Sequence, residues 1–343
     1  MRALNRWSSL AGCLALAVGI SGAAHAQTAA EWDQVVAAAK KEGRLALYIA
    51  NVGSPENAAM IKLFETKYGI AVDKFESPPP ALAERVRTEV NTGRTIGDVS
   101  IFGGTTHTLL DKGGFLQKHG GIPNAKNLVV KPSVEPEIPT SVNAYSIFVN
   151  TNLVPPDQEP KSWLELLDPK WKGRLLSNDF DVPGAGQSFF SVLLDKFGRE
   201  FHEKLAKQNV TFFGGGSRTE VRRVASGEFA AIMPVILGDI KNYPGLPIKA
   251  LIPNEGLPFT PVSVATIKGA PHPNAARLFL NFMLEPETQL IYASSGIMPT
   301  IGGLESRVAE DRRWMITPKL LGRQELEGQD ERMQLANKIY KGR

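Results

Sequence analysis

The sequence has a single cysteine, Cys13, among 343 residues. Cys13 lies in an N-terminal segment in which Arg2 and Arg6 precede an apolar run at 14–20, and Ala-His-Ala at 24–26 has the small-x-small form of a secretory cleavage site. We expect cleavage of this signal peptide after Ala26 and export to the periplasm. The mature chain then has no thiol nucleophile, no disulfide and no cysteine ligand for a metal.

A lipid anchor is the alternative for this segment, because Leu-Ala-Gly-Cys at 10–13 has the form of a lipoprotein cleavage box. Too few apolar residues precede Cys13 to form the core of such a signal, and the apolar run continues beyond it. We therefore favour the cleaved signal peptide. The run is also shorter than the roughly 20 apolar residues that a membrane span needs.

Neither sign of charge is in large excess. The chain has 39 Lys and Arg against 35 Asp and Glu, and a net charge of +4. Removal of the leader takes away two arginines and no acid, which lowers the net charge to +2. A nucleic-acid-binding surface calls for clustered basic residues, whereas the charges here are dispersed. We expect no nucleic-acid partner.

Local motifs of enzymes and metal sites are also missing. The sequence contains no Gly-x-Ser-x-Gly elbow, no phosphate-binding loop ending in Gly-Lys-Ser/Thr and no His-Glu-x-x-His. The segment from Asp179 starts like a calcium loop, but Pro183 replaces a ligand and Phe190 stands where a glutamate is required. We expect no enzyme and no cofactor. The mature chain's histidines lie far apart, at 107, 119, 202 and 272.

The first half of the mature chain alternates short apolar runs with helical patterns. This alternation predicts a parallel sheet with right-handed crossovers. The pattern predicts helices at 29–42, 54–68 and 108–116, a helix that ends at Gly93, and strands at 45–50, 70–75 and 99–102. Residues 120–139, with four prolines, are predicted to form a loop.

A second α/β unit follows the stretch 144–152, which we interpret as the crossing between two lobes. The pattern predicts strands at 145–149, 173–177, 209–213, 229–236 and 262–267, and helices at 187–197, 274–284, 286–295 and 329–340. Capping boxes at Ser162/Glu165 and Ser217/Glu220 mark two helix starts. The length also favours two lobes. We predict a first lobe at 27–143 plus 262–305, a second at 144–261, and a tail at 306–343 packed on a lobe surface.

Several short motifs together resemble the extracellular solute-binding proteins of ABC importers. They are Asp-Val at 98–99, Asn-Thr-Asn at 150–152, Pro-Lys-Ser-Trp at 160–163, 166–173, Ser-Gly-Glu at 226–228, 268–280 and Gln289. The branch that binds ferric ion, phosphonates and sugar phosphates is the most similar. The resemblance implies a type II periplasmic-binding fold, with two α/β lobes joined by a two-strand hinge. It also implies a monomer that closes on a solute and docks on a membrane permease.

The sequence departs from the iron-binding relatives at their ligands. Those relatives carry a histidine after the first strand, a glutamate after the third and adjacent tyrosines after a later strand. The aligned positions hold Val52, Gly103, Leu237 and Gly238. Ferric iron needs anionic oxygen donors. We therefore predict a small organic anion as the ligand: a carboxylate, a phosphonate or a phosphate ester. Ferric iron stays as the alternative, as does a transferase or hydrolase on the same fold, suggested by His107 beside 103–106.

Ligands of parallel sheets bind beyond the carboxyl ends of the strands, and helix N-termini attract anions. The predicted ligand-binding residues are Asn51, Ser54, Gly103, Gly104, Thr105, Thr106, Tyr145, Asp181, Gly184, Ala185, Gly186, Gln187, Ser188 and Arg218.

Each of these predictions has a structural alternative. Arg218 is the strongest candidate, because an arginine in the first turn opposes the helix dipole, but it could instead pair with Glu220 or Glu228. The stretches 103–106 and 184–188 could be simple strand-to-helix turns. Ser54 could serve only as a helix cap, Tyr145 only as a core residue, and Asp181 could be solvated.

Overall fold

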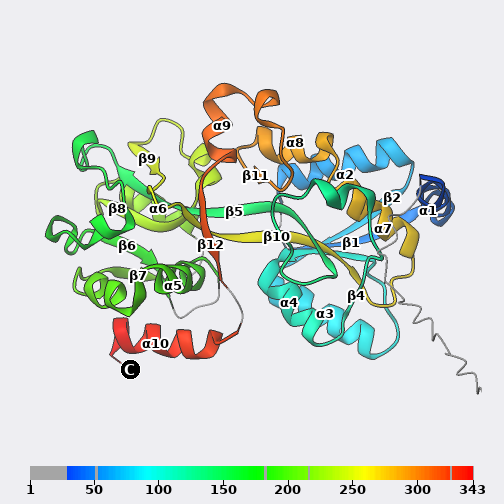
Figure 1. Ribbon diagram of the computed structural model, residues 1–343, viewed down its shortest axis with the longest axis horizontal. Coiled ribbons are helices and arrows are strands. Elements are labelled where there is room, and N and C mark those ends of the chain that lie inside the picture. The colour runs from blue at the N-terminus through cyan, green and yellow to red at the C-terminus, as the bar shows by residue number, and fades with distance from the viewer. Residues whose placement is uncertain (1–28, 51–52, 181–183, 215–216, 325–326, 343) are drawn as a thin grey trace, which may run out of the picture.

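The computed structural model describes residues 29–50, 53–180, 184–214, 217–324 and 327–342. The predicted leader lies outside these residues. Twelve strands form a mixed sheet whose main path runs β2-β1-β3-β10-β5-β8-β6-β7. Helices cover it, and two lobes stand at its ends (Figure 1). Among the described residues, no helix has the length and apolar character needed to cross a membrane.

In the first lobe, β1 lies between β2 and β3 and pairs with both in parallel, and the sequence predicts this parallel pairing. On its other side, β3 pairs with β10 in antiparallel fashion. Its elements are α1 (Ala29–Glu42), β1 (Arg44–Ile49), α2 (Pro55–Tyr68), β2 (Ala71–Glu76), α3 (Pro79–Asn91), β3 (Val99–Gly103), α4 (Gly104–Lys112), β4 (Leu116–Gln117) and η1 (Pro123–Asn127). The caps are those expected from the sequence. Ser54 precedes α2, and Gly69 ends it with a φ of 68°.

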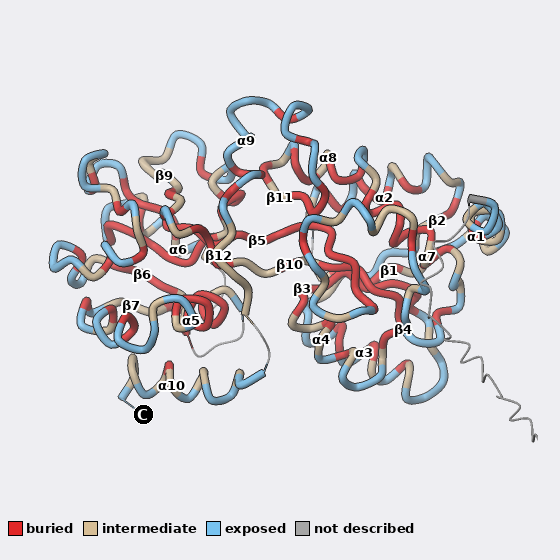
Figure 2. Tube along the Cα trace, in the orientation of Figure 1, coloured by how far each residue is buried: buried red, intermediate tan, exposed pale blue. Residues whose placement is uncertain are grey.

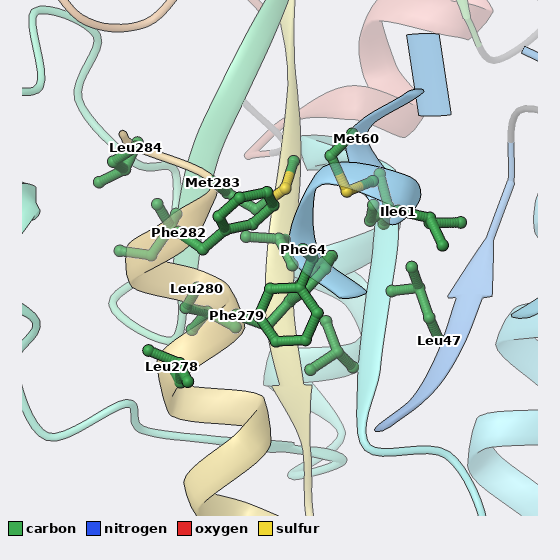
Figure 3. Packing of buried hydrophobic residues seen from close by; sticks show 14 of the residues in the cluster. Leu47, Met60, Ile61, Phe64, Leu278, Phe279, Leu280, Phe282, Met283 and Leu284 are labelled. Atoms are coloured by element: carbon green, nitrogen blue, oxygen red, sulfur yellow. The ribbon is translucent and has the colours of Figure 1, made fainter. Parts of the chain in front are cut away.

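The core of this lobe joins segments that are far apart in the sequence. Phe64 of α2 packs against Phe279 of α7, with ring centroids 5.0 Å apart, and against Phe282 at 5.1 Å (Figure 3). The chain therefore returns to the first lobe after building the second. The returning elements are α7 (Pro273–Phe282), α8 (Pro286–Ser294), β11 (Met298–Pro299) and η6 (Glu305–Arg307).

The helix predicted at 108–116 begins four residues earlier, at Gly104, and ends at Lys112. The chain passes from β3 directly into α4, and Gly104 lets this turn pack closely against its neighbours. A Cβ on Gly104 would lie 3.1 Å from Ser133 Oγ and 3.2 Å from the Pro261 ring. Leu116, the last residue of the predicted helix, instead begins β4. Strand β4 pairs with Thr266 and Ile267 of β10.

Two long antiparallel strands, β5 (Glu137–Asn150) and β10 (Leu257–Ile267), run through both lobes (Figure 1). β10 pairs with β3 from Val262 onward, while β5 pairs with β8 and β9 from Tyr145 onward. The chain thus crosses near Ala144 and Phe259, which face each other. β5 starts inside the predicted loop. Its Pro139 lies opposite Ser263, where the register shifts, and such irregular positions tolerate proline.

The second lobe repeats the parallel arrangement, with β6 between β7 and β8. Its elements are η2 (Pro156–Gln158), η3 (Trp163–Leu167), η4 (Pro169–Trp171), β6 (Leu175–Asn178), α5 (Ala185–Ala206), β7 (Thr211–Phe213), α6 (Ser217–Ala225), β8 (Ala231–Ile236), η5 (Leu237–Asn242) and β9 (Ile248–Leu251). Gly198 interrupts α5 with non-helical φ and ψ of 76° and 178°. The helix predicted to end at residue 197 therefore only kinks at Gly198 and continues to Ala206.

The segment after the crossing is fastened by Trp163, whose side chain is fully buried and donates from Nε1 to the Gly256 carbonyl at 2.8 Å. Ser162 Oγ accepts a hydrogen bond from the Leu164 amide, and Glu165 accepts one from Lys161. The capping box therefore starts a 3-10 turn, with Glu165 reaching back one residue further than a standard box.

The C-terminal segment returns across the junction of the lobes. α9 (Glu310–Ile316) leads into β12 (Leu320–Arg323), which pairs in parallel with β10. α10 (Gln329–Lys341) then packs along α5 (Figure 1). Burial follows the sheet in both lobes, while the outer faces of the helices stay exposed (Figure 2). The strand β12 was not predicted.

Candidate functional site

The larger of two cavities at the junction, about 400 Å³, is lined by both lobes. The first lobe supplies the start of α2 and the ends of β1 and β3. The second lobe supplies the end of β8 and η5. Strand β5, which runs through both lobes, supplies Thr140, Ser141 and Asn143. The polar residues that line this cavity include Ser54, Glu56, Asn57, Thr140, Ser141, Asn143, Asp239, Lys241, Asn242 and Tyr292.

A smaller cavity of about 180 Å³ lies beside the first turns of α4. It is lined by Gly104, Thr105, Thr108, Lys112, Ser133, Phe259, Thr260, Pro261, Arg323, Gln324 and Glu327. Arg323 of β12 donates to the carbonyl oxygens of Lys131 at 2.7 Å and Pro132 at 3.2 Å. The C-terminal segment therefore forms one wall of this cavity and holds the loop that forms another.

The structure brings part of the predicted set together. Ser54 and Gly103 line the larger cavity, and Gly104 and Thr105 line the smaller, whereas Thr106 lines neither. Ser54 is also a helix cap, since its Oγ accepts a hydrogen bond from the Asn57 amide at 3.3 Å. Carboxyl ends of strands and helix N-termini thus meet at one edge, as the α/β pattern predicts.

Tyr145 is nearly fully buried, and its hydroxyl donates to Thr260 Oγ1 at 3.2 Å. Thr260 Oγ1 in turn lies 3.5 Å from Ser188 Oγ at the start of α5. These contacts connect β5, β10 and α5. Burial raises the pKa of the Tyr145 phenol, which therefore stays neutral.

Residues 184–188 line neither cavity. Gly186 is in close contact with the preceding strand, because a Cβ there would lie 2.2 Å from the Asp179 carbonyl oxygen. Gln187 turns toward the C-terminal segment, where its Oε1 accepts a hydrogen bond from Gln329 Nε2 at 2.8 Å. A role for this turn in ligand binding stays a prediction.

Asn51, Val52 and Asp181 lie outside the described residues, as does the side chain of Arg218. The two acids considered as partners for Arg218, Glu220 and Glu228, each form an ion pair with Arg223. Its guanidinium lies 2.9 Å from Glu220 and 2.5 Å from Glu228.

Sequence reasoning missed Glu56 and Lys241, which form an ion pair of 2.8 Å in the larger cavity. Burial by itself would raise the pKa of Glu56. The hydrogen bonds from Lys241, from the backbone amide of Glu56 itself and from Ser54, together with the charge of Lys241, outweigh burial and lower this pKa from 4.5 to about 2. The carboxylate is therefore ionised throughout the physiological range. An acid in the first turn of a helix was the one local signal; nothing local pointed to Lys241.

Metal ligands do not gather in the described part of the chain, where no three Asp, Glu, His or Cys side chains are placed to hold an ion. His107, the residue that suggested the enzyme alternative, lies in α4, is fully buried and lines neither cavity. Its Nε2 lies 3.0 Å from Ser100 Oγ and its Nδ1 3.6 Å from Glu137 Oε2, both in the protein interior. These contacts are those of a packed histidine.

Residues 100–327 match the family model described as "Bacterial extracellular solute-binding protein". A curated relative, an uncharacterized protein of Haemophilus influenzae, is 28% identical over 135 residues. That match covers 38% of this chain and 39% of the relative's length.

Solved structures share the fold over most of the chain. A Trichodesmium protein (IdiA, FutA) in complex with iron and citrate is 19% identical, with a TM-score of 0.73 over 87% of this chain and 99% of that one. Iron-bound HitA from Pseudomonas aeruginosa is 23% identical, with a TM-score of 0.67 over 86% and 99%. The substrate-binding protein of an Agrobacterium tumefaciens ABC transporter is 15% identical, with a TM-score of 0.69 over 87% and 94%. These likenesses establish the two-lobed fold that the sequence predicts.

Proposed function

The chain belongs to the bacterial extracellular solute-binding proteins, and we propose that it captures a small solute between its lobes and delivers it to an ABC importer permease. The observation that carries this proposal is the cavity of about 400 Å³ lined by both lobes. Ligand pockets of this size hold small molecules. The lobes comprise 27–143 with 262–305, and 144–261. Rotation about β5 and β10 would open and close the cavity between them.

The proposed receptor works in the periplasm as a monomer, after removal of the leader at 1–26. The tail, 306–343, belongs to the binding unit, because β12 pairs with β10 and Arg323 lines the smaller cavity.

For the solute, ferric iron has more support from the comparisons than an iron-free organic anion. Two of the similar structures contain iron, and one of them also contains citrate. Among the described residues of the cleft, no three His, Cys, Asp or Glu side chains are placed to hold a bare ion. We propose a solute that agrees with both observations: ferric iron in a complex with an organic anion, which itself supplies the oxygen donors for the metal.

The cleft has groups suited to such an anionic complex. Lys241 lines the larger cavity, and Gly104 and Thr105, the first residues of α4, line the smaller one. Helix N-termini favour carboxylates and phosphates. A hydrogen bond to a charged group contributes about 1.5–3 kcal/mol, and micromolar affinity requires about 8 kcal/mol. Three to five such contacts are therefore sufficient.

The test compares three additions to protein purified without refolding: ferric citrate, citrate, and ferric iron released from a weak chelator. Isothermal titration calorimetry gives the affinity, and native mass spectrometry gives the bound species. We expect ferric citrate to bind with the highest affinity and to be retained as protein, iron and citrate together. At a hundred times its Kd it should stabilise the fold by about 2.7 kcal/mol.

Two other outcomes would change the proposal. Retention of iron without the anion would mean that the protein itself supplies the ligands, including residues outside the described ranges. Equal binding of citrate, a phosphonate or a phosphate ester without iron would restore the organic anion predicted from the sequence. The helix N-termini and Lys241 favour that second candidate.

A further inference from the structure

Glu56 and Lys241 are joined across the cleft. Lys241 Nζ donates to Glu56 Oε1 at 2.8 Å, and both residues line the larger cavity. Glu56 lies in the first turn of α2, while Lys241 lies in η5, directly after β8. In Figure 1, α2 belongs to the lobe of β1 and β2, and β8 belongs to the opposite lobe. The ion pair therefore connects the two lobes without passing through the hinge strands.

Each partner is fixed to its own lobe. The Glu56 side chain is 8% exposed, and its Oε2 accepts a hydrogen bond from Ser54 Oγ at 2.8 Å. α2 is held by the aromatic contacts of Phe64 with α7. On the other side, η5 packs against β5 and β9 of the second lobe. The backbone at each partner therefore moves with its own lobe.

The start of η5 is already in close contact with the hinge region. A Cβ on Gly238 would lie 2.6 Å from the Gly296 carbonyl oxygen, just before β11, which pairs with β5. Lys241 follows three residues later and reaches away from this contact toward α2. Separation of the lobes about β5 and β10 would lengthen the Lys241–Glu56 distance. A carboxylate left in this cleft without its cation loses a charge-assisted hydrogen bond.

We propose that Glu56 and Lys241 form a positioning pair that holds the lobes together in the solute-free protein and so sets the width of the cleft. The pair places one cationic and one anionic group in the cavity at a fixed separation. An entering anion meets Lys241 in a preset position. The inference concerns the resting position of the lobes and not the identity of the solute, so it can fail or hold independently of the iron complex.

The test measures the lobe separation of solute-free protein. The mature chain contains no cysteine, so Lys62→Cys on α2 and Lys196→Cys on α5 provide two exposed labelling positions. Distances between the two labels are measured in Lys241→Met, Glu56→Gln and the double variant, together with the radius of gyration by small-angle scattering. We expect each single variant to shift the ratio of closed to open molecules toward open by about tenfold or more. The double variant should open no further than the singles, because the two residues act as a unit.

The matched control is Lys249→Met. Lys249 forms an ion pair of 2.7 Å with Glu159 within the second lobe, and the Glu159 side chain is 13% exposed against 8% for Glu56. It should leave the label distances unchanged. Glu56→Gln keeps the shape of the side chain, so it reports on the pair even if Lys241→Met folds poorly. Label distances and scattering like those of the unsubstituted protein in folded Glu56→Gln would overturn the proposal. So would additive opening in the double variant.

Discussion

The Tyr145 hydroxyl donates to Thr260 Oγ1 at 3.2 Å, and this bond ties together the two strands that cross between the lobes. Tyr145 lies on β5 and Thr260 on β10, close to the facing pair Ala144 and Phe259. The hydroxyl is thus used within the hinge, while Thr260 borders the smaller cavity. Tyr145 stabilises the crossing and positions Thr260.

Tyr145→Phe should therefore affect stability more than solute binding. Loss of one buried hydrogen bond lowers the free energy of unfolding by about 0.5–1.5 kcal/mol. Urea denaturation measures this change, and calorimetry should show the affinity within about threefold of the original, well under the tenfold that 1.4 kcal/mol represents. A tenfold loss of affinity at unchanged stability would instead make the hydroxyl a direct solute contact.

Trp163→Ala should destabilise the second lobe strongly. The side chain is fully buried, packs edge-on against Phe189 and donates to the Gly256 carbonyl. Truncation of a buried tryptophan costs about 3–5 kcal/mol. The neighbouring Leu164 is exposed, so Leu164→Ala should change the free energy of unfolding by no more than about 0.5 kcal/mol. Similar melting temperatures for the two variants would contradict the anchoring role of Trp163.

Gly186→Ala and Gly103→Ala compare a glycine that is in close contact with neighbouring backbone with a glycine that has open space around it. A Cβ at 186 would lie 2.2 Å from the Asp179 carbonyl, whereas a Cβ at 103 meets nothing within 4 Å and Gly103 already has a φ of −64°. Gly186→Ala should therefore destabilise the start of α5 by about 1–3 kcal/mol, and Gly103→Ala should fold normally. Equal thermal stability of both variants would mean that α5 shifts to admit the methyl group.

The sequence predicts the elements of both lobes well where the signals are local. Ser54 and Gly69 bound α2, Gly43 follows α1, and the apolar runs become the parallel strands. The start of α4 was misplaced, because Gly103 and Gly104 read as a loop. The strand in fact passes directly into the helix, and of the two glycines only Gly104 packs closely against its neighbours, Ser133 and Pro261.

The cleft is less predictable, because its contacts join residues that are far apart in the chain. The position of Ser54, Gly103, Gly104 and Thr105 beside the cavities follows from the general rule on strand ends and helix N-termini. The pairing of Glu56 with Lys241 spans 185 positions, and Arg323 reaches Lys131 across 192. β12 is short, without alternation of apolar and polar residues, and becomes a strand only because β10 offers it an edge.

Glu56 should make stability depend on pH in the acid range. Its pKa is lowered from 4.5 to about 2 in the folded protein, so the ionised form stabilises the fold fully above 4.5. As the pH falls from 4.5 toward 2, protonation removes that contribution. The free energy of unfolding should therefore fall more steeply between pH 5 and 3 in the original protein than in Glu56→Gln. Urea titrations at several pH values measure both slopes, and parallel slopes would contradict the ion pair.

His202 should give a second dependence on pH, centred on α10. Its Nε2 lies 3.0 Å from the Phe190 carbonyl, which can only accept, so Nε2 carries the proton and Nδ1 accepts from the Tyr340 hydroxyl at 2.8 Å. Burial lowers the pKa of the ring from 6.5 to about 3, and the bond to Phe190 offsets only part of this effect. The folded protein therefore holds the neutral ring, while the unfolded chain takes up a proton below pH 6.5.

The neutral His202 ring makes its full contribution to the free energy of unfolding above pH 6.5. This contribution is lost as the pH falls toward 3, because the unfolded chain binds the proton more readily, and the loss is at most about 1.4 kcal/mol per pH unit. His202→Phe should flatten the slope between pH 6.5 and 4.5, a range in which Glu56 stays ionised. The substitution will also lower the free energy of unfolding at every pH. The measurement that tests the prediction is therefore the slope of this free energy against pH, and not its absolute value. Tyr340→Phe leaves the ring in place and should keep the slope. An unchanged slope in His202→Phe would mean that the ring is protonated in the folded protein, and that α10 is held by its other contacts, among them the Arg332–Asp195 ion pair and the Gln329–Gln187 hydrogen bond.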